Sequence, residues 1–410
     1  MSTLRALRDA ALIALVAVLT VQGLRRWVGD RYLVPSDSME PVIHGDPVHG
    51  DVVFVDKTAR VGGRRRGDLV VVAHPEQPGH QLVKRVVADG DDVAACCIDI
   101  QNGELWLGPD QQNLRPVVKD PLASGELRVA WSRWRGADGG DPFSARLTLG
   151  AERAFESVAA MRETLREDVL LARQKRVAFA SQPQNPLPDG VLGTLQPIDA
   201  TYLDLTGRRS ETGAGEMVRD ASLTLELEPS SAAELLLTVE TPGEALTWHW
   251  QSSGALGLWR NGVDVENVRL AAGPVSRVTF GLLDNRVWID LGDGRTAVIA
   301  RHDDWVVTDE RGLPPGFRTL LHAAAVGEPL RPTAVAVDRD IYYARLRVAA
   351  LPGSPGSWPR TVPQGQWFLL GDNCFDSRDS RQFGAVAKTS FLGVPCCVIG
   401  PPARRRWLCR

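Results

Sequence analysis

One uninterrupted apolar run near the start of the 410-residue chain constrains where the remaining residues can fold. Residues 10–24 read AALIALVAVLTVQGL without a charge, and arginines flank the run on both sides. A helix needs roughly 20 residues to span the core of a bilayer. The run reaches that length when it extends from Leu7 to Val28 and the flanking arginines reach the interface. The sequence therefore predicts a cytoplasmic tip and a transmembrane anchor helix in residues 1–28.

Two other readings of the run are weaker. A cleavable signal peptide has the same basic start and short apolar core, but residues 20–23 (TVQG) offer no small-x-small cleavage site. An amphipathic surface helix needs a polar face, and none interrupts the run. The flanking positive charges are balanced, so a cytoplasmic N-terminus is only a preference under the positive-inside rule.

Composition sets limits on the rest of the chain. A hydrophobic content of 44% and a charged content of 24% indicate a globular protein, and the length allows two or three domains. A net charge of -3 gives no reason to expect nucleic-acid binding. The six cysteines form no CxxC pair, which argues against zinc ribbons and thioredoxin-like sites. A disulfide between the pair Cys96 and Cys97 and the pair Cys396 and Cys397 stays open in an oxidising compartment. No metal or cofactor is expected.

Short β-branched runs bounded by turn residues predict strands near both ends of the chain. They indicate one mainly β body that is built from residues 29–118 and residues 356–410. The predicted strands are residues 51–56, 68–73, 81–87, 104–107, 367–370 and 391–399.

An insert from 119 to 355 separates the two parts of this body. Near residues 151–175, apolar residues recur at intervals of three and four, which predicts a helix. A proline-rich linker follows. Short alternating runs with Asp-Asn, Gly-Asp-Gly and Asn-Gly turns then predict a β-sandwich over residues 199–351.

Candidate chemistry begins in residues 35–41, which read PSDSMEP and contain Ser38. Serine and proline are ordinary turn residues, so a loop next to the membrane is the simpler reading of this stretch by itself.

Lys84 gives Ser38 a possible partner. In the strand 81–87, alternation places Lys84 on one face with Leu82 and Val86, and Arg85 on the opposite face. Burial disfavours the ammonium form and lowers the pKa of a lysine, and a neutral amine can take the proton of a serine hydroxyl. A surface lysine on an edge strand is the simpler reading of Lys84 alone.

A third segment, residues 371–384, follows a predicted strand and is rich in turn formers. Two Asp, two Ser and two Arg lie within residues 376–381, which is also what a solvated, ion-paired loop contains. A serine hydroxyl that orients a base and an Asp/Arg pair that braces a loop would instead build a preorganised site.

Together the three segments resemble the bacterial type I signal peptidases, which are membrane-bound endopeptidases with a Ser/Lys dyad. The first box of that family, serine-x-serine-methionine-x-proline, is present at residues 36–41. Its lysine box resembles residues 66–71 followed by 84–87, and its closing box resembles residues 371–373 and 377–381. The resemblance covers the two ends of the chain and leaves out the insert.

The resemblance implies a role for each matching residue. Ser38 would be the nucleophile and Lys84 its general base. The Ser36 hydroxyl and the backbone N–H of Ser38 would form the oxyanion hole, and Ser377 would hydrogen-bond Lys84. The residues implied to support the site are Gly371, Asp372, Asp379 and Arg381, with Asp379 and Arg381 paired.

The resemblance also implies the partners and the location. The substrates would be exported preproteins with signal peptides, bound as an added strand whose last residues fit an Ala-x-Ala pattern. The protein would be a single-pass protein of the bacterial cytoplasmic membrane, with its catalytic body on the extracytoplasmic side. The chain departs from the family at Asp37, where glycine is frequent. His44 and His49 lie in a lengthened loop and are read as loop residues, not metal ligands.

Two other functions remain open on the sequence. A regulatory autoprotease of the SOS-repressor type uses the same dyad, but such proteins are cytosolic and lack an anchor. A membrane-anchored protein with a degenerate peptidase body would instead use its insert to bind glycan or protein. Four tryptophans of the insert offer a sugar platform, although at strand spacing they fit a sandwich core better: Trp248, Trp250, Trp259 and Trp288.

Overall fold

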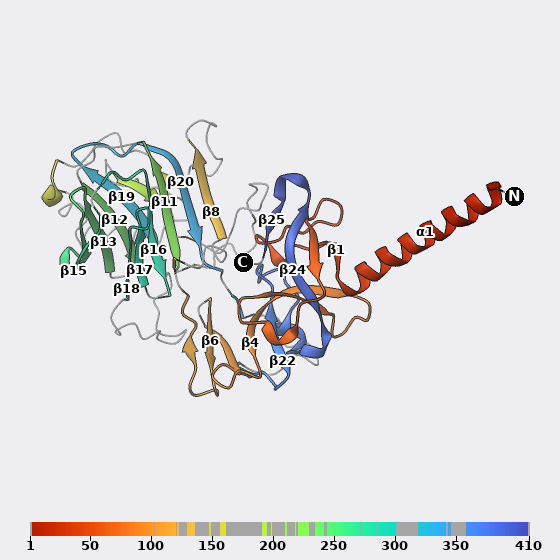
Figure 1. Cartoon of the computed structure of the whole chain (residues 1–410). Helices are drawn as coiled ribbons and strands as arrows, with labels where there is room; N and C mark the ends of the chain where they lie inside the picture. Colours follow the sequence, from red (N-terminus) through yellow and green to blue (C-terminus); the bar gives the residue numbers. More distant parts are fainter. Residues whose placement is uncertain are drawn as a thin grey trace. The chain divides into compact units, whose positions relative to one another are not determined.

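The computed structural model divides the chain into two compact units (Figure 1). The first unit joins Met1–Pro116 to Tyr343–Arg410, and the second is Val117–Tyr342. The structure describes residues 2–122, 129–135, 147–148, 156–160, 191–194, 198, 210, 218–228, 234–300, 319–345 and 358–408, apart from one or two positions at a time inside some of these ranges.

The first unit begins with a single long helix, α1 (Ser2–Trp27), which leads into β1 (Gly29–Leu33). Its apolar side chains from Leu12 to Leu24 are exposed. Arg25 and Arg26 lie in its last turn, where positive charge complements the helix dipole. A helix thus forms where the sequence predicts one. Within the described residues, however, no helix is both long and apolar enough to cross a membrane, and the anchor stays a prediction.

The body of the first unit is an antiparallel β structure whose strands come alternately from the two ends of the sequence. The sheet order is β1-β2-β24-β3-β4-β22-β23, with β25 beside β24. Because β24 pairs with both β2 and β3, the two sequence blocks form one structure and neither completes the sheet alone. The strands are β2 (Val52–Asp56), β3 (Leu69–Ala73), β4 (Gln81–Asp89), β22 (Gln366–Leu370), β23 (Val386–Ala387), β24 (Phe391–Gly400) and β25 (Arg406–Trp407).

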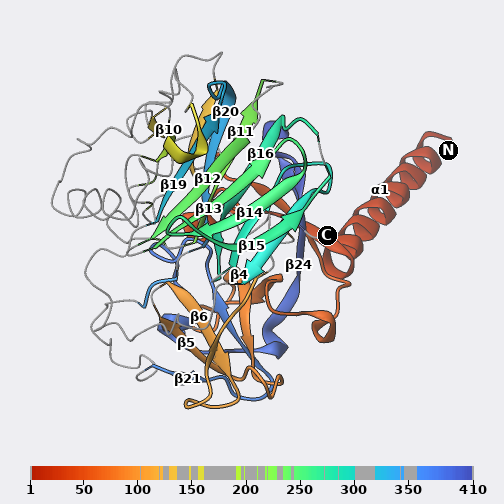
Figure 2. The ribbon, with the colours of Figure 1, turned by 90° about the vertical axis from the view of Figure 1, so that its left-hand side faces the viewer.

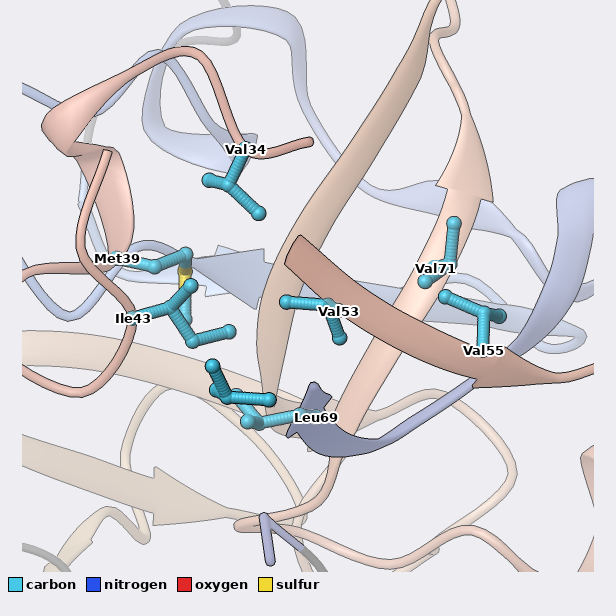
Figure 3. Close-up of a cluster of buried hydrophobic side chains, with 8 residues drawn as sticks. Val34, Met39, Ile43, Val53, Val55, Leu69 and Val71 are labelled. Carbon is cyan, nitrogen blue, oxygen red and sulfur yellow. The ribbon is translucent and has the colours of Figure 1, made fainter. Parts of the chain in front are cut away.

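A buried apolar cluster lies between these strands and the chain after β1. It includes Met39 and Ile43, both 0% exposed, and Figure 3 shows them beside Val53 and Leu69. The burial of Met39 fixes the turn that carries the preceding residue, Ser38. The other members of the cluster are Val34, Val55, Val71 and Val398.

A smaller sheet with the order β21-β5-β6-β7 completes the first unit. Gly103 makes the turn between β5 and β6 with a φ of 87°, a conformation that favours glycine. The five cysteines in the described part of the chain are free, so no disulfide joins Cys96 or Cys97 to Cys396 or Cys397. The strands are β5 (Cys97–Gln101), β6 (Glu104–Gly108), β7 (Arg115–Pro116) and β21 (Arg360–Thr361).

The second unit is a sandwich of two antiparallel sheets. One has the order β15-β14-β13-β12-β19-β10-β9 and the other β18-β17-β16-β11-β20-β8. Figure 2 shows β12 to β15 running side by side. The sheets pack face to face, since β12 contacts β16 and β11 contacts β19. The strands are β8 (Val129–Arg135), β9 (Leu147–Thr148), β10 (Val191–Thr194), β11 (Ala221–Leu227), β12 (Glu234–Thr241), β13 (Glu244–Gln251), β14 (Ala255–Arg260), β15 (Val263–Arg269), β16 (Arg277–Leu283), β17 (Arg286–Asp290), β18 (Thr296–Ala300), β19 (Leu320–Val326) and β20 (Pro332–Arg339).

The four tryptophans considered as a sugar platform are all buried in this unit, as a sandwich core requires. Trp248 is 0% exposed and Trp259, the most exposed of the four, is 4%. Most of the helix predicted near 151–175 lies outside the described residues. In the described part of that range, residues 158–160 are helical. The proline-rich linker also lies outside them.

The second unit ends at Tyr342, earlier than the expected insert boundary at 355. The residues that follow are bonded to the first unit. The N–H of Tyr343 donates to the Gly103 carbonyl at 2.9 Å, and Arg345 NH2 lies 2.6 Å from Asp99 Oδ1. These bonds fix where the chain returns to the first body.

A buried charge cluster joins the two ends of the second unit. Lys119 pairs with Asp284, at 3.3 Å between Nζ and Oδ1, and with Asp340. The N–H of Asp284 donates to Asp220 Oδ2 at 2.7 Å. Burial raises the pKa of Asp284 to about 6, against the opposing effect of the Lys119 charge.

Candidate active site

Ser38 lies in a short 3₁₀ turn, Asp37–Met39, and its side chain is 9% exposed. Met39 is buried in the apolar cluster, while Asp37 on the other side of Ser38 is exposed. The buried Met39 side chain therefore fixes one side of the turn, and Ser38 lies at the boundary between core and solvent.

Lys84 reaches this serine from the middle of β4. Its Nζ forms a hydrogen bond of 2.7 Å with Ser38 Oγ, and the lysine is only 2% exposed. In the sheet it pairs with Val70, which is fully buried. The structure thus brings together the two residues that the sequence singled out, although they lie 46 residues apart in the sequence.

The surroundings of Lys84 favour its neutral form. Burial lowers its pKa to about 8, whereas the negative charges of Asp379 and Asp372 act in the opposite direction. A lysine with this pKa is partly deprotonated near neutral pH. A neutral amine at hydrogen-bond distance from a hydroxyl can act as its general base.

Arg85, the neighbour of Lys84, is also buried, which the alternation of the strand does not predict. Alternation does turn Arg85 away from Lys84, but that side of β4 is covered and Arg85 is only 6% exposed. Its guanidinium makes a bidentate pair with Asp372, at 2.7 Å from Nε to Oδ1 and 2.6 Å from NH2 to Oδ2. Asp372 therefore connects the loop of residues 371–384, the closing loop, to the strand that carries Lys84.

A second buried pair, Asp379 with Arg381, stabilises the closing loop internally. Arg381 Nε lies 2.9 Å from Asp379 Oδ1, and Arg381 NH2 lies 2.8 Å from Oδ2. Asp379 is fully buried, and it also accepts a hydrogen bond from the N–H of Gly371 at 3.0 Å. Both ends of the loop are fixed through this carboxylate.

Gly371 and Asn373 bring the loop against the turn that carries Ser38. The N–H of Asn373 donates to the Ser38 carbonyl, and its Nδ2 donates to the Asp37 carbonyl, both at 3.2 Å. A Cβ at Gly371 would lie 2.4 Å from the Ser38 carbonyl oxygen and 2.2 Å from Ser377 Oγ. Only glycine permits this close approach.

The two auxiliary serines are placed differently from each other. Ser36 is exposed, and its hydroxyl lies 3.5 Å from Ser38 Oγ. Ser377 is 3% exposed, and its hydroxyl has no hydrogen-bond partner in the described part of the chain. The expected hydrogen bond from Ser377 to Lys84 is therefore not formed in this structure, although Ser377 lies beside Gly371 at the edge of the site.

Three further residues support the site although the sequence contains little or no signal for them. Arg85 could not be recognised because alternation says nothing about what covers each face. Ser380 accepts the N–H of Leu369 at 2.9 Å, and Arg360 NH1 donates to the Ser380 and Arg381 carbonyls. The only sequence signal for Ser380 was its place inside the closing box, and none pointed to Arg360.

Comparison with known proteins matches the two ends of the chain to one family. The sequence profile of the family "Signal peptidase, peptidase S26" matches residues 7–108 and 339–398. Signal peptidase I of Mycobacterium tuberculosis is 39% identical over 130 residues, which are 30% of this chain and 41% of that protein. Signal peptidase I of Aquifex aeolicus is 33% identical over 76 residues, 18% of this chain and 28% of that protein. The chain thus spans less than half the length of these relatives.

Solved structures are similar only at a low level. A sheep galectin-11 complex with glycerol has a TM-score of 0.20 and 14% identity, over 30% of this chain and 91% of that one. A glycoside hydrolase family 32 structure from Bifidobacterium adolescentis also has a TM-score of 0.20, with 11% identity over 76% of this chain and 57% of that one. Neither similarity bears on the chemistry of this chain.

Proposed function

We infer that the chain belongs to the signal peptidase, peptidase S26, family, whose profile matches residues 7–108 and 339–398, and we propose that it is a serine endopeptidase that removes signal peptides from exported preproteins. The observation that carries the proposal is the 2.7 Å hydrogen bond between Ser38 Oγ and the buried Lys84 Nζ. At this contact a serine hydroxyl lies within hydrogen-bond distance of a buried lysine whose pKa is lowered.

In the proposed mechanism, Ser38 Oγ attacks the scissile carbonyl while neutral Lys84 takes the hydroxyl proton. The resulting oxyanion is stabilised by the backbone N–H of Ser38 and the hydroxyl of Ser36. Lys84 then gives its proton to the leaving amine, which releases the mature protein and leaves the signal peptide as an ester on Ser38. A water molecule, deprotonated by Lys84, hydrolyses this ester and restores the free serine.

The remaining site residues keep this dyad in place. The Arg85–Asp372 pair fixes the closing loop to β4, and the Asp379–Arg381 pair fixes the loop to itself. Ser377 is the proposed orienting group for the amine. Its buried hydroxyl has no hydrogen-bond partner among the described residues. It is therefore available to bond Lys84 when the amine turns from Ser38 toward the leaving group.

The proposed substrate is an extended segment that ends in small residues and lies beside the site as an added strand. The proposed location is the bacterial cytoplasmic membrane, with α1 as a single anchor in the bilayer and the first unit on the extracytoplasmic side. The exposed apolar side chains of α1 support this placement. The short connection from Trp27 to Ser38 would keep the site near the bilayer, where a signal sequence is embedded.

The alternative is a membrane-anchored binding protein that acts through the second unit and has a degenerate peptidase body. Two observations disfavour it. The Ser38–Lys84 contact is intact, and the tryptophans that would offer a glycan platform are buried.

Cleavage of a model preprotein by the wild type, Ser38→Ala and Lys84→Ala tests the proposal. We expect each variant to lose activity by a factor of at least about 10³, as for removal of a nucleophile or its base elsewhere. Ser390→Ala and Lys57→Ala, which change a serine and a lysine outside the site, should cleave like the wild type. Full activity in either dyad variant would disprove the dyad, and an inactive wild type would favour the binding-protein alternative.

A further inference from the structure

Two arginines that follow β24 hold a buried carboxylate near the nucleophile turn. Arg404 Nε donates to Asp51 Oδ1 at 2.6 Å, and Arg406 NH2 donates to Oδ2 at 3.0 Å. Asp51 is fully buried and also accepts the N–H of His44 at 3.1 Å. A buried carboxylate with two guanidinium partners is strongly fixed, since removal of both partners would leave its charge buried and uncompensated.

The same arginines also hold the backbone of the loop that joins the nucleophile turn to Asp51. Arg404 NH2 donates to the His49 carbonyl at 2.5 Å, and Arg406 NH2 donates to the Val42 carbonyl. The loop of residues 42–51 is therefore fixed near its beginning and at its end by one short segment from the far end of the sequence.

This loop lies directly against the peptide that precedes Ser38. A Cβ at Gly45 would lie 1.9 Å from the Ser36 carbonyl oxygen and 2.6 Å from the Asp37 nitrogen. The loop is also tied to the residue two places after Ser38, because His44 Nδ1 lies 2.5 Å from Glu40 Oε1. A shift of the loop must therefore shift the backbone on both sides of the nucleophile.

We propose that Arg404 and Arg406 are positioning residues for the oxyanion hole, acting through Asp51 and the loop of residues 42–51. The inference rests on the proposed function, in which the Ser38 N–H and the Ser36 hydroxyl receive the oxyanion. Neither arginine is among the charges that shift the pKa of Lys84. Their loss should therefore weaken transition-state stabilisation and leave the proton transfer of the dyad unchanged.

The test compares Arg404→Ala/Arg406→Ala with Arg405→Ala in the full-length protein. Arg405 has the same charge in the same segment, but its Nε donates to the Ile399 carbonyl and not to the loop. The readouts are kcat and KM for a model preprotein, binding of a peptide boronate that forms a tetrahedral adduct with Ser38, and binding of an uncleavable peptide of the same sequence.

We expect the double variant to lose about 10- to 100-fold in kcat and in boronate affinity, less than the full loss of an oxyanion donor. KM, the affinity for the uncleavable peptide, and the pH at which the rate falls on the acid side should stay as in the wild type. Arg405→Ala should match the wild type in every readout. Thermal unfolding of each variant shows that equal amounts of folded protein are compared.

Two outcomes would overturn the inference. One is an unchanged kcat in the double variant, and the other is an equal loss of affinity for the boronate and the uncleavable peptide. If the double variant does not fold, Arg404→Lys and Gly45→Ala replace it, and both should show the same selective loss of kcat. A wild-type protein that neither cleaves the preprotein nor binds the boronate would instead disprove the proposed function.

Discussion

The two units are both built of antiparallel sheets and both bury charged side chains, but these charges lie in different settings. The second unit fills the space between its sheets with tryptophan and aliphatic residues, as any sandwich must. The first unit also buries five charged residues that are brought together from β4 and the closing loop. These are Lys84, Arg85, Asp372, Asp379 and Arg381. Apolar packing tolerates many sequences, whereas buried charge requires defined partners, so these five residues specify the geometry of the first unit more exactly than its apolar core does.

The buried charges of the second unit sharpen this contrast. Lys119 pairs with both Asp284 and Asp340, and the charge of Asp220 adds to the raised pKa of Asp284, whereas Arg85 makes a bidentate pair with Asp372. The cluster lies where the chain enters and leaves the unit and joins its two ends. In the first unit, the buried pair Arg85–Asp372 connects β4, which carries Lys84, to the closing loop. In the second unit, the buried charges connect the residues at which the chain enters and leaves the unit.

The largest effect should come from breaking the Arg85–Asp372 pair. Arg85→Ala leaves a carboxylate buried without its partner, which costs about 3–5 kcal/mol in the free energy of unfolding. Arg378→Ala is the matched control, because its pair with Glu76 is exposed and its removal should change stability by less than about 0.5 kcal/mol. Thermal or denaturant unfolding measures both. Equal losses would show that burial does not distinguish the two pairs.

Gly371→Ala should come next, with its effect mainly on activity. A methyl group there must displace Ser377 or the Ser38 backbone, and a shift of about 1 Å at a reactive group can lower the rate about 100-fold. Preprotein cleavage, normalised to folded protein, checks this. Gly63→Ala, at a position where a Cβ meets nothing within 4 Å, should behave like the wild type. A fully active Gly371→Ala would mean that the closing loop does not hold the Ser38 turn in place.

The pH dependence of cleavage follows from the lowered pKa of Lys84. Only the neutral amine accepts the serine proton, so activity should rise with pH through about 8 and level off above it. Below that value kcat/KM should fall about tenfold per pH unit, which initial rates between pH 6 and 9 will measure. An acid limb centred near the ordinary lysine pKa, or a flat profile, would exclude Lys84 as the base.

The smallest expected effect lies in the second unit and has the opposite pH sense. The raised pKa of Asp284 means that its protonated form is favoured by folding, so its contribution to stability is lost as pH rises through about 6. Relative to Asp284→Asn, the wild type should therefore gain roughly 1 kcal/mol between pH 7 and pH 5. Hydrogen exchange resolved by unit measures this difference. Asp293→Asn, at an exposed turn, should show no such pH dependence.

Much of the site could be predicted because its residues lie in short segments with strong local patterns. The turn at Ser38, the strand that carries Lys84 and the turn-rich loop after Gly371 were each predicted from neighbouring residues. The division of the body into two parts also followed from strand signals at both ends of the chain. The pairing of β24 with both β2 and β3 shows how these parts join.

The remaining features depend on contacts that no local pattern encodes. Alternation correctly placed Lys84 and Arg85 on opposite faces of β4, but it could not show that both faces are covered. The Asp51 cluster joins a loop near the beginning of the chain to Arg404 and Arg406, more than 350 residues away. Ser377 was expected to bond Lys84, yet its hydroxyl has no described partner in the folded chain.

By itself, the sequence determined the chemical types present in this protein: a serine in a turn, a lysine among apolar neighbours in a strand, and a loop dense in Asp, Ser and Arg. Only the tertiary structure decided which of these groups meet and which charges lose their water. The physical reason is that the chemical type and local conformation of a residue depend on its neighbours in sequence. Its burial, its pKa and its partner depend on segments that the fold brings from far along the chain.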